Sequence, residues 1–307
     1  MTWPRRVIAG TTYLLTRRCT ERRYLLVPRG VSPKLVGYCI ALAAQRHGIL
    51  IHATVVMSNH WHAVLTDPHG RVTEFARDVH ALTARALNAH YGRWESFWSS
   101  QRLSLVELDG PEDVLEKLVY TTTNPVEAGL VERPRDWPGV RTLPSHVLDA
   151  PRCFPRPRTR FFSRSALPEE VELHLTVPAQ LAHLGEGEYV RRYQAGVLER
   201  VEALEARRVS EGRHVMGAHA LKRQRKDGRP KTCAPRRKLD PAVASRDRAR
   251  RVGLLTELRR FRDAYREARR RWLQGDKGVL FPWGTLLMST LPGVRCERAP
   301  PCALQVA

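Results

Sequence analysis

Hydrophobic and polar positions follow two different periods over the first 125 residues of the chain. Short runs rich in β-branched and aromatic residues predict strands at 10–16, 49–57, 60–66 and 103–108. Apolar residues at helical spacing predict helices at 32–47, 72–91 and 111–120. The first helix has Ser32 as its expected N-cap, Pro33 at its first position and Gly48 as its stop.

The order of these elements is β-α-β-β-α-β-α, and the "SN" turn at 58–59 joins two of the strands as a hairpin. Mixed strands and helices with a hairpin connection favour an antiparallel or mixed sheet. We therefore expect an α+β fold with helices packed on one face of the sheet.

The pattern changes beyond residue 130. Residues 132–168 are rich in Pro and Arg and indicate a linker or an extended arm, while 187–211 and 242–273 predict long helices. A basic loop at 221–238 and a short apolar element at 277–288 complete this part. The expected division is a first domain at 1–145, a linker at 146–168, and a basic, mainly helical region of unknown role at 169–307.

Charge is distributed unevenly between the two halves. Residues 1–150 carry 18 Lys and Arg against 14 Asp and Glu, a net of +4, whereas residues 151–307 carry 34 against 17, a net of +17. A surface this basic usually meets a polyanion, most often nucleic acid, and a solvated basic helix surface is the alternative. No apolar run approaches the roughly 20 residues that span a bilayer, and the N-terminus has no signal-peptide pattern.

Six cysteines occur without a CxxC pair: Cys19, Cys39, Cys153, Cys233, Cys296 and Cys302. This spacing argues against a zinc knuckle and against a disulfide framework. We expect a cytoplasmic protein in which most of these thiols are packing residues.

Residues 57–64, "MSNHWHAV", place two histidines two positions apart in a predicted strand. Alternate residues of a strand share a face, so His60 and His62 would lie side by side with Trp61 on the other face. Two imidazoles can bind one divalent ion and leave positions open for a substrate oxygen. Ordinary hydrogen-bonded histidines are the alternative interpretation.

Residues 119–131, "VYTTTNPVEAGLV", carry a second candidate group near the end of the third helix. Tyr120 and Asn124 share a helical face if the helix continues that far. A tyrosine oxygen can attack phosphorus and hold a covalent link to DNA. Tyr120 as a core aromatic and Asn124 as the N-cap of a short helix, with Pro125 at N1, are the structural alternatives.

The two motifs together, "MSNHWHAVL" and "YTTTNPVEAGLV", resemble the signature of the REP-associated tyrosine transposases, which belong to the HUH single-strand transposases of bacterial insertion sequences. The resemblance covers about residues 8–145 and includes "TTYLLTRRCTERRYLL" and "GRWESFW". One departure is "DWPGVRT" at 136–142, where family members often carry "WPWSS", so DNA contacts of that segment are not carried over.

The resemblance implies a ferredoxin-like α+β fold and a DNA strand-transfer enzyme acting on single-stranded or hairpin DNA. It implies that His60 and His62 bind Mg²⁺ or Mn²⁺, with Asn124 as a third ligand, and that Tyr120 is the nucleophile. Cleavage would leave a 5′-phosphotyrosine and a free 3′-OH at hairpin-forming repeats. The protein would be a monomer or a homodimer, associated with the bacterial nucleoid.

Four arginines near the first strand, Arg17, Arg18, Arg22 and Arg23, are candidates for DNA contacts, with solvated surface residues as the alternative. Trp94 and Trp98 are expected in the core rather than stacked on bases. A chain ending near residue 165 is expected to keep a folded catalytic domain and to bind DNA with reduced affinity. A domesticated nucleic-acid-binding protein, a rolling-circle-type nickase and a metal hydrolase using only the two histidines are the rival functions.

Overall fold

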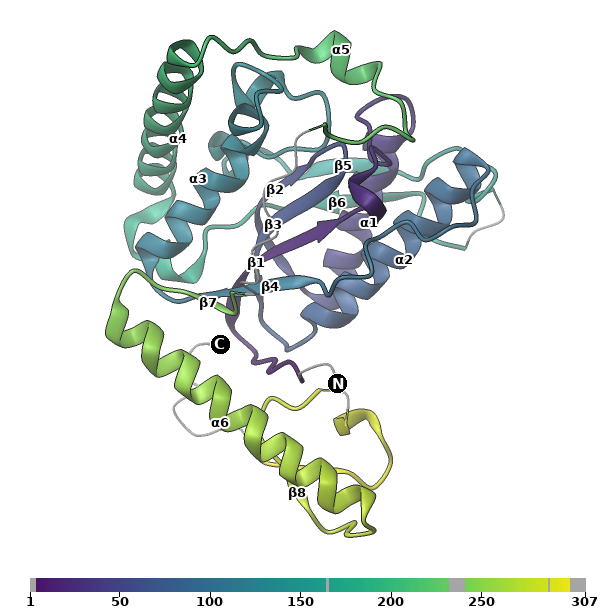
Figure 1. The fold of residues 1–307 in the computed structure, drawn as a ribbon, viewed down its shortest axis with the longest axis vertical. Helices are drawn as coiled ribbons and strands as arrows, with labels where there is room; N and C mark the ends of the chain where they lie inside the picture. The colour runs from purple at the N-terminus through teal and green to yellow at the C-terminus, as the bar shows by residue number, and fades with distance from the viewer. Residues whose placement is uncertain (1–3, 164–165, 232–240, 287, 299–307) are drawn as a thin grey trace.

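The computed structural model describes residues 4–163, 166–231, 241–286 and 288–298. Cys233, Cys302 and part of the predicted basic loop lie outside these residues. The central sheet has five strands in the order β2-β3-β1-β4-β7 (Figure 1). Their bounds are Thr11–Arg18 for β1, Leu50–Val56 for β2, His60–Asp67 for β3, Ser104–Leu108 for β4 and Val243–Ala244 for β7.

The first four strands pair antiparallel, with β1 between β3 and β4, and β2 outside β3. Two helices, α1 (Ser32–His47) and α2 (Val72–Tyr91), connect them in the order β1-α1-β2-β3-α2-β4. This order and pairing are those of a ferredoxin-like fold. The predicted α+β class and the mainly antiparallel sheet are confirmed.

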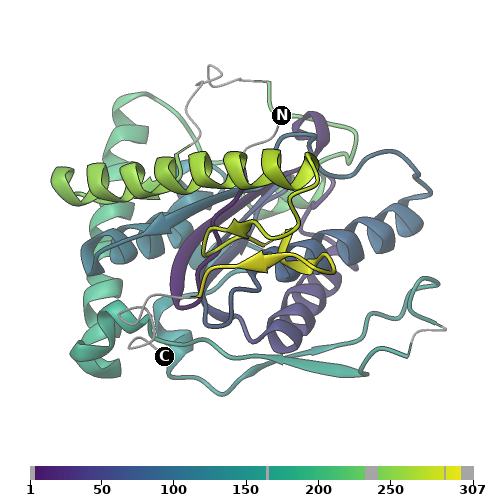
Figure 2. The ribbon, with the colours of Figure 1, turned by 90° about the horizontal axis from the view of Figure 1, so that it is seen from below.

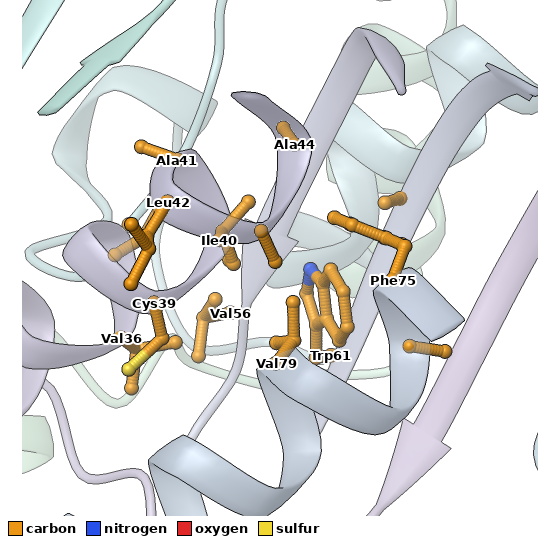
Figure 3. Close-up of a cluster of buried hydrophobic side chains, with 14 of the residues drawn as sticks. Val36, Cys39, Ile40, Ala41, Leu42, Ala44, Val56, Trp61, Phe75 and Val79 are labelled. Carbon is orange, nitrogen blue, oxygen red and sulfur yellow. The ribbon is translucent and has the colours of Figure 1, made fainter. Parts of the chain in front are cut away.

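One face of the sheet packs against α1 and α2. The core there contains Trp61 of β3 and Val56 of β2, with Phe75 and Val79 of α2 and Ile40 of α1 (Figure 3). Trp61 is 1% exposed and its indole nitrogen donates to Thr54 Oγ1 at 2.8 Å. The face of β3 that carries Trp61 therefore packs in the core.

The opposite face is covered as well, by α3 (Pro111–Glu127) and α4 (Gly185–Ser210). Leu14, Ala53 and Val64 of the sheet share a buried cluster with Leu118 of α3 and Tyr193 of α4. The expectation of helices on one face thus holds for α1 and α2 only. The difference follows from strand alternation, because both faces of the central strands carry apolar residues and each needs a cover.

The ends of α1 have local causes. Gly48 adopts a left-handed conformation with φ of 66°, which a glycine does at low cost, and its N–H bonds to the Ala44 carbonyl. At the other end, Val31 rather than Ser32 is the N-cap, and Ser32 is buried in the first turn before Pro33. The predicted helix is right and its predicted cap is one residue late.

The second half of the chain contacts the first at several places. A hairpin of β5 (Arg152–Pro155) and β6 (Glu170–Leu173) packs on α1, and Phe154 and Leu173 join the core of that face. The short helix α5 (Ala218–Lys222) buries Leu221 beside Val55 and Trp137. The predicted division after residues 145 and 168 stays a prediction, but the elements beyond it are in contact with the sheet.

The last helix, α6 (Arg248–Leu273), lies with residues 277–286 at the lower end of the molecule in Figure 1, and Figure 2 shows this end from below. There β8 (Leu280–Phe281) pairs with β9 (Arg295–Cys296), and Phe281 forms a small core with Ala268 and Val279. The two-residue strand β7 adds to the outer edge of β4. No helix within the described ranges is long and apolar enough to cross a membrane.

Candidate active site

Strand β3 begins at the first histidine of the "HWH" run. His60 pairs with Arg18 and His62 with Thr16 across the β1–β3 ladder, so both histidines lie on one face. Their ring centroids are 4.7 Å apart in an edge-on arrangement. His62 is buried and His60 is partly exposed, so the pair lies at the N-terminal end of the interior strand β3 and solvent reaches it from the His60 side.

Helix α3 supplies the other two groups from the same face. It continues through Asn124 and Pro125 to Glu127, so Asn124 is an interior residue of the helix and the alternative interpretation of it as an N-cap is wrong. The reason is the packing of this turn: residues 121–126 are all buried, which offsets the hydrogen bond that Pro125 cannot donate. Tyr120 and Asn124 are therefore one helical turn apart on one face of α3, as the prediction of a shared site requires.

The four candidate residues converge. The ring centroids of His62 and Tyr120 are 5.4 Å apart, and His60 Nε2 is 3.3 Å from Asn124 Oδ1. The Asn124 amide also hydrogen-bonds the Tyr120 phenol, which favours the phenolate. Two imidazoles, one carboxamide and one phenol thus share a single small region between β3 and α3.

Neighbouring hydrogen bonds fix the protons of His60. Asn59 Nδ2 donates to the Arg22 carbonyl at 3.1 Å, which turns Asn59 Oδ1 toward His60 Nδ1 at 2.7 Å. His60 Nδ1 must then carry the proton, and Nε2 of the neutral ring has a free lone pair. That lone pair faces Asn124 Oδ1, which is also an acceptor. His60 Nε2 and Asn124 Oδ1 are therefore two acceptors that face each other with no proton between them.

This donor set fits a divalent cation. Each Nδ1 has a hydrogen-bond partner, Asn59 Oδ1 for His60 and Thr16 Oγ1 at 2.8 Å for His62, the arrangement usual for metal-binding imidazoles. A cation would satisfy the facing lone pairs of His60 and Asn124. No group of three or more His, Cys, Asp and Glu side chains in the described part of the chain is placed to hold a metal. In this site the third candidate metal ligand, beside His60 and His62, is the amide oxygen of Asn124.

Burial sets the charge of the site. It lowers the pKa of His60 to about 4, with the Arg18 charge adding to the effect, and lowers the pKa of His62 well below its usual value. Both rings are neutral at pH 7, as a metal ligand must be. Burial and the charge of Glu127 raise the pKa of Tyr120, while Arg18 and Arg200 act in the opposite direction.

The four predicted DNA-contact arginines do not form one group. Arg18 and Arg22 lie near enough to His60 to lower its pKa. Arg23 pairs with Glu21 at 2.6 Å, and Arg17 donates to the Gln101 carbonyl at 2.6 Å. Arg18 and Arg22 therefore remain candidates next to the site, and a DNA contact for any of the four stays a prediction.

Trp94 and Trp98, both predicted to pack in the core, differ in burial. Trp98 is buried, and its indole nitrogen donates to the His80 carbonyl at 2.9 Å. Trp94 is 89% exposed, so its predicted place in the core is wrong. The loop from Gly92 carries it outward, since the following Phe97 and Trp98 fill the space against α2.

Three residues at the site were not found from the sequence: Thr16, Asn59 and Arg200. Asn59 immediately precedes His60, and that proximity was an available signal. Thr16 meets His62 only through the register of β1 on β3, and Arg200 reaches α3 from α4, where it pairs with Glu127 at 3.1 Å. Neither of those two positions has a local sequence signal.

The chain is similar to several solved structures, two of which have the following properties. One is a REP-associated tyrosine transposase bound to a REP hairpin, with 21% identity and a TM-score of 0.41 over 48% of this chain and 86% of that chain. The other is a protein of Deinococcus radiodurans R1 thought to be a transposase, with 16% identity and a TM-score of 0.27 over 34% of this chain and 85% of that chain. No family model matches the chain, and no curated protein matches it. Both similarities concern less than half of this chain.

Proposed function

We propose that this protein is a DNA strand-transfer enzyme of the transposase type, which cuts and rejoins single-stranded or hairpin DNA through a covalent tyrosine intermediate. The observation that carries the proposal is the convergence of His60, His62, Asn124 and Tyr120 in one small region between β3 and α3. A phenol beside a cation-binding donor set is suited to attack on phosphorus. The basic second half supplies affinity for the backbone.

In the proposed reaction, Tyr120 Oη forms a bond to the scissile phosphorus and the bond from phosphorus to the 3′ oxygen breaks. The products are a 5′-phosphotyrosine and a 3′-OH end; the phenol proton leaves to solvent, and the departing 3′ oxygen takes a proton from solvent. Attack by another 3′-OH reverses the step and releases Tyr120, so no nucleotide cofactor is consumed. Arg18 and Arg200 favour the phenolate that attacks.

His60, His62 and Asn124 would hold Mg²⁺ or Mn²⁺, which when bound would neutralise phosphate charge. The contribution of the protein is to fix these donors before DNA arrives. Asn59 and Thr16 hold the two rings by their Nδ1 atoms, so neither ring must rotate. The Asn124 amide at the same time orients the phenol, which couples the cation site to the nucleophile.

The test is an adduct assay with labelled hairpin DNA and Mg²⁺ on a denaturing gel. Tyr120→Phe keeps the ring and removes one oxygen, so folding and DNA binding should persist while cleavage and the adduct disappear. Tyr91→Phe is the matched control, because Tyr91 is also a partly buried tyrosine but donates to the Leu25 carbonyl away from the site. His60→Ala and His62→Ala should lose cleavage even when metal is restored after chelation.

An adduct that persists in Tyr120→Phe would show that another residue attacks the phosphate. Cleavage that survives in Tyr120→Phe without any adduct, but is lost in His60→Ala, would instead indicate a metal hydrolase. DNA binding with no cleavage by the wild-type chain would support a domesticated binding protein.

A further inference from the structure

The outer edge of β2 has two separate partners. Near its end, Val55 pairs with Arg141 in an antiparallel bridge, and near its start, Ile51 pairs with Leu175 in a parallel bridge. Between these bridges the two partner segments diverge. A cavity of about 510 Å³ opens there beside Thr54, lined by the segment around 140–152 and by residues 173–175. Its volume lies within the usual range for small-molecule sites.

The polar lining of this cavity is mainly cationic. Arg141 and Arg152 both line it, and Asp149 is the carboxylate among the lining residues. Arg152 Nη1 donates to the Arg141 carbonyl at 3.2 Å, which places the second arginine against the first. Burial and the Arg152 charge both lower the pKa of Arg141, so the two guanidinium groups repel each other. An anion between them would relieve this repulsion.

Arg141 also has an unused donor. Its Nε is buried and has no hydrogen-bond partner among the described residues. A buried charged donor without an acceptor is costly, and each such group calls for an explanation. His146 adds another donor, since its Nδ1 accepts from the Leu143 N–H at 3.2 Å. The proton of the neutral ring is then on Nε2.

We propose that this cavity, the β2-edge pocket, binds a phosphate group between Arg141 and Arg152, with His146 as a further donor. A guanidinium fork matches phosphate geometry, and two such groups with an N–H donor resemble the usual surroundings of a bound phosphate. The apolar side of the pocket, formed by Leu173 and Leu175, suits the remainder of a nucleotide. The phosphate belongs either to a DNA strand or to a free mononucleotide.

The position of the pocket relates it to the candidate active site without merging the two. Arg141, Val55 and His62 stand on one row across the sheet, because Val55 pairs with both. Two strand spacings separate the backbones of Arg141 and His62, about 10 Å. A strand held at the active site could therefore place a neighbouring phosphate in the pocket. Only this DNA source rests on the proposed function, while phosphate binding itself does not.

The first measurement is calorimetric titration of the full chain with inorganic phosphate and with a 5′-mononucleotide. Arg141→Gln and Arg152→Gln should each weaken binding about tenfold, the size expected for one hydrogen bond to a charged group. Arg158→Gln is the matched control, an exposed arginine that lies between β5 and β6 and does not line the pocket. Asp149→Asn should strengthen binding, a gain that a misfolded variant could not produce.

The second measurement is the affinity of the same variants for a single-stranded oligonucleotide. A parallel loss of phosphate and oligonucleotide binding in both arginine variants identifies a strand phosphate, and a loss of phosphate or mononucleotide binding alone identifies a free nucleotide. Tyr120→Phe should leave phosphate binding unchanged, so a failure of the proposed cleavage reaction can be distinguished from a failure of phosphate binding. Absence of saturable phosphate binding, or equal affinity in the wild-type chain and both arginine variants, overturns the proposal.

Discussion

Helices α4 and α6 have the same length, 26 residues, and opposite characters. In α4, five arginines balance five glutamates, whereas α6 carries ten arginines against three acidic residues, a net of +7. On α4, Tyr189, Val190 and Tyr193 are buried in the cluster that also holds α3. On α6, Phe261 and Ala268 are buried, and Ala268 packs into the separate core around Phe281.

The way each helix attaches to the first half differs accordingly. Tyr193 inserts its ring behind α3 and donates its hydroxyl to the Leu118 carbonyl at 3.1 Å. The α6 region is joined by ion pairs, from Arg250 to Asp109 at 2.6 Å and from Arg246 to Glu116 at 3.3 Å. One helix thus supports the element that carries Tyr120, and the other presents charge from the outer side of the sheet. Similar length and helicity do not imply a similar role.

The largest expected effect comes from two truncations of the chain, one that ends before α4 and one that ends between α4 and α6. A chain ending at residue 165 loses α4 and leaves the α3 cluster uncovered, at about 1.5–3 kcal/mol for each large apolar side chain. That loss rivals the whole stability of an ordinary domain, so this chain should not fold, contrary to the expectation from the sequence. A chain ending at residue 231 keeps α4 and should fold. Circular dichroism and urea unfolding check both, and two equally folded fragments would contradict the assignment.

The same comparison can be made with single substitutions of two fully buried aromatic residues, Tyr193 of α4 and Phe281 of the C-terminal core. Tyr193→Ala should cost about 3–5 kcal/mol and lower the midpoint of global urea unfolding. Phe281→Ala creates a similar void, but only in the small C-terminal core, so DNA cleavage should persist. The measurements are urea unfolding followed by far-ultraviolet circular dichroism, and hydrogen exchange of α3. Equal loss of α3 protection in the two variants would show that the C-terminal core also supports α3.

The next prediction concerns charge. Arg259, Arg260 and Arg269 are exposed on α6, and replacing all three by Gln should reduce the slope of log affinity against log salt for single-stranded DNA by about 2. The matched control replaces Arg191, Arg192 and Arg207 of α4, where Glu188 already pairs with the first two. An equal change of slope in both triple variants would mean that only total charge matters.

The smallest expected effect is on acidification. Hydrogen bonds from Arg250 hold the pKa of Asp109 below its usual value, and Lys117 and Arg246 together lower the pKa of Glu116 despite its partial burial. A carboxyl group with a lowered pKa stabilises the fold above its unfolded pKa, and the effect disappears as the pH falls through the folded value. Protection of α6 against hydrogen exchange should therefore fall between about pH 5 and pH 3, and by more than that of α4, where Arg192 and Arg191 of the same helix lower the pKa of Glu188 but α4 is held to α3 by buried apolar residues. Equal losses in both helices would contradict the proposed attachment.

Much of the fold was predictable because its signals are local. The strands at 49–57 and 60–66 and the helix stop at Gly48 follow from residue type and period, and the structure has them within a few residues. Strand parity likewise placed Trp61 opposite the two histidines. The cover on the second face was not predictable, because the α4 residues that pack on α3 lie some seventy positions downstream. Helical periodicity shows an apolar stripe but not its partner.

The candidate site shows the same limit. Tyr120 and Asn124 could be placed on one face only if the helix ran past Pro125, and burial of that turn, a tertiary effect, decides that it does. The partner of His62, Thr16, depends on the register between β1 and β3, which no local pattern specifies. The exposure of Trp94 also escaped prediction, because it depends on which of three nearby aromatics fills the space against α2.

The short partners at the two margins of the sheet have a consequence for self-association. Unpaired strand edges invite pairing with other chains, and here β7 covers the β4 edge while the segments at Arg141 and Leu175 cover the β2 edge. All three come from positions downstream of the four strands they protect. A nascent chain that has emerged only as far as β4 therefore exposes both edges at once, and the segments that follow β4 remove this risk of aggregation during synthesis.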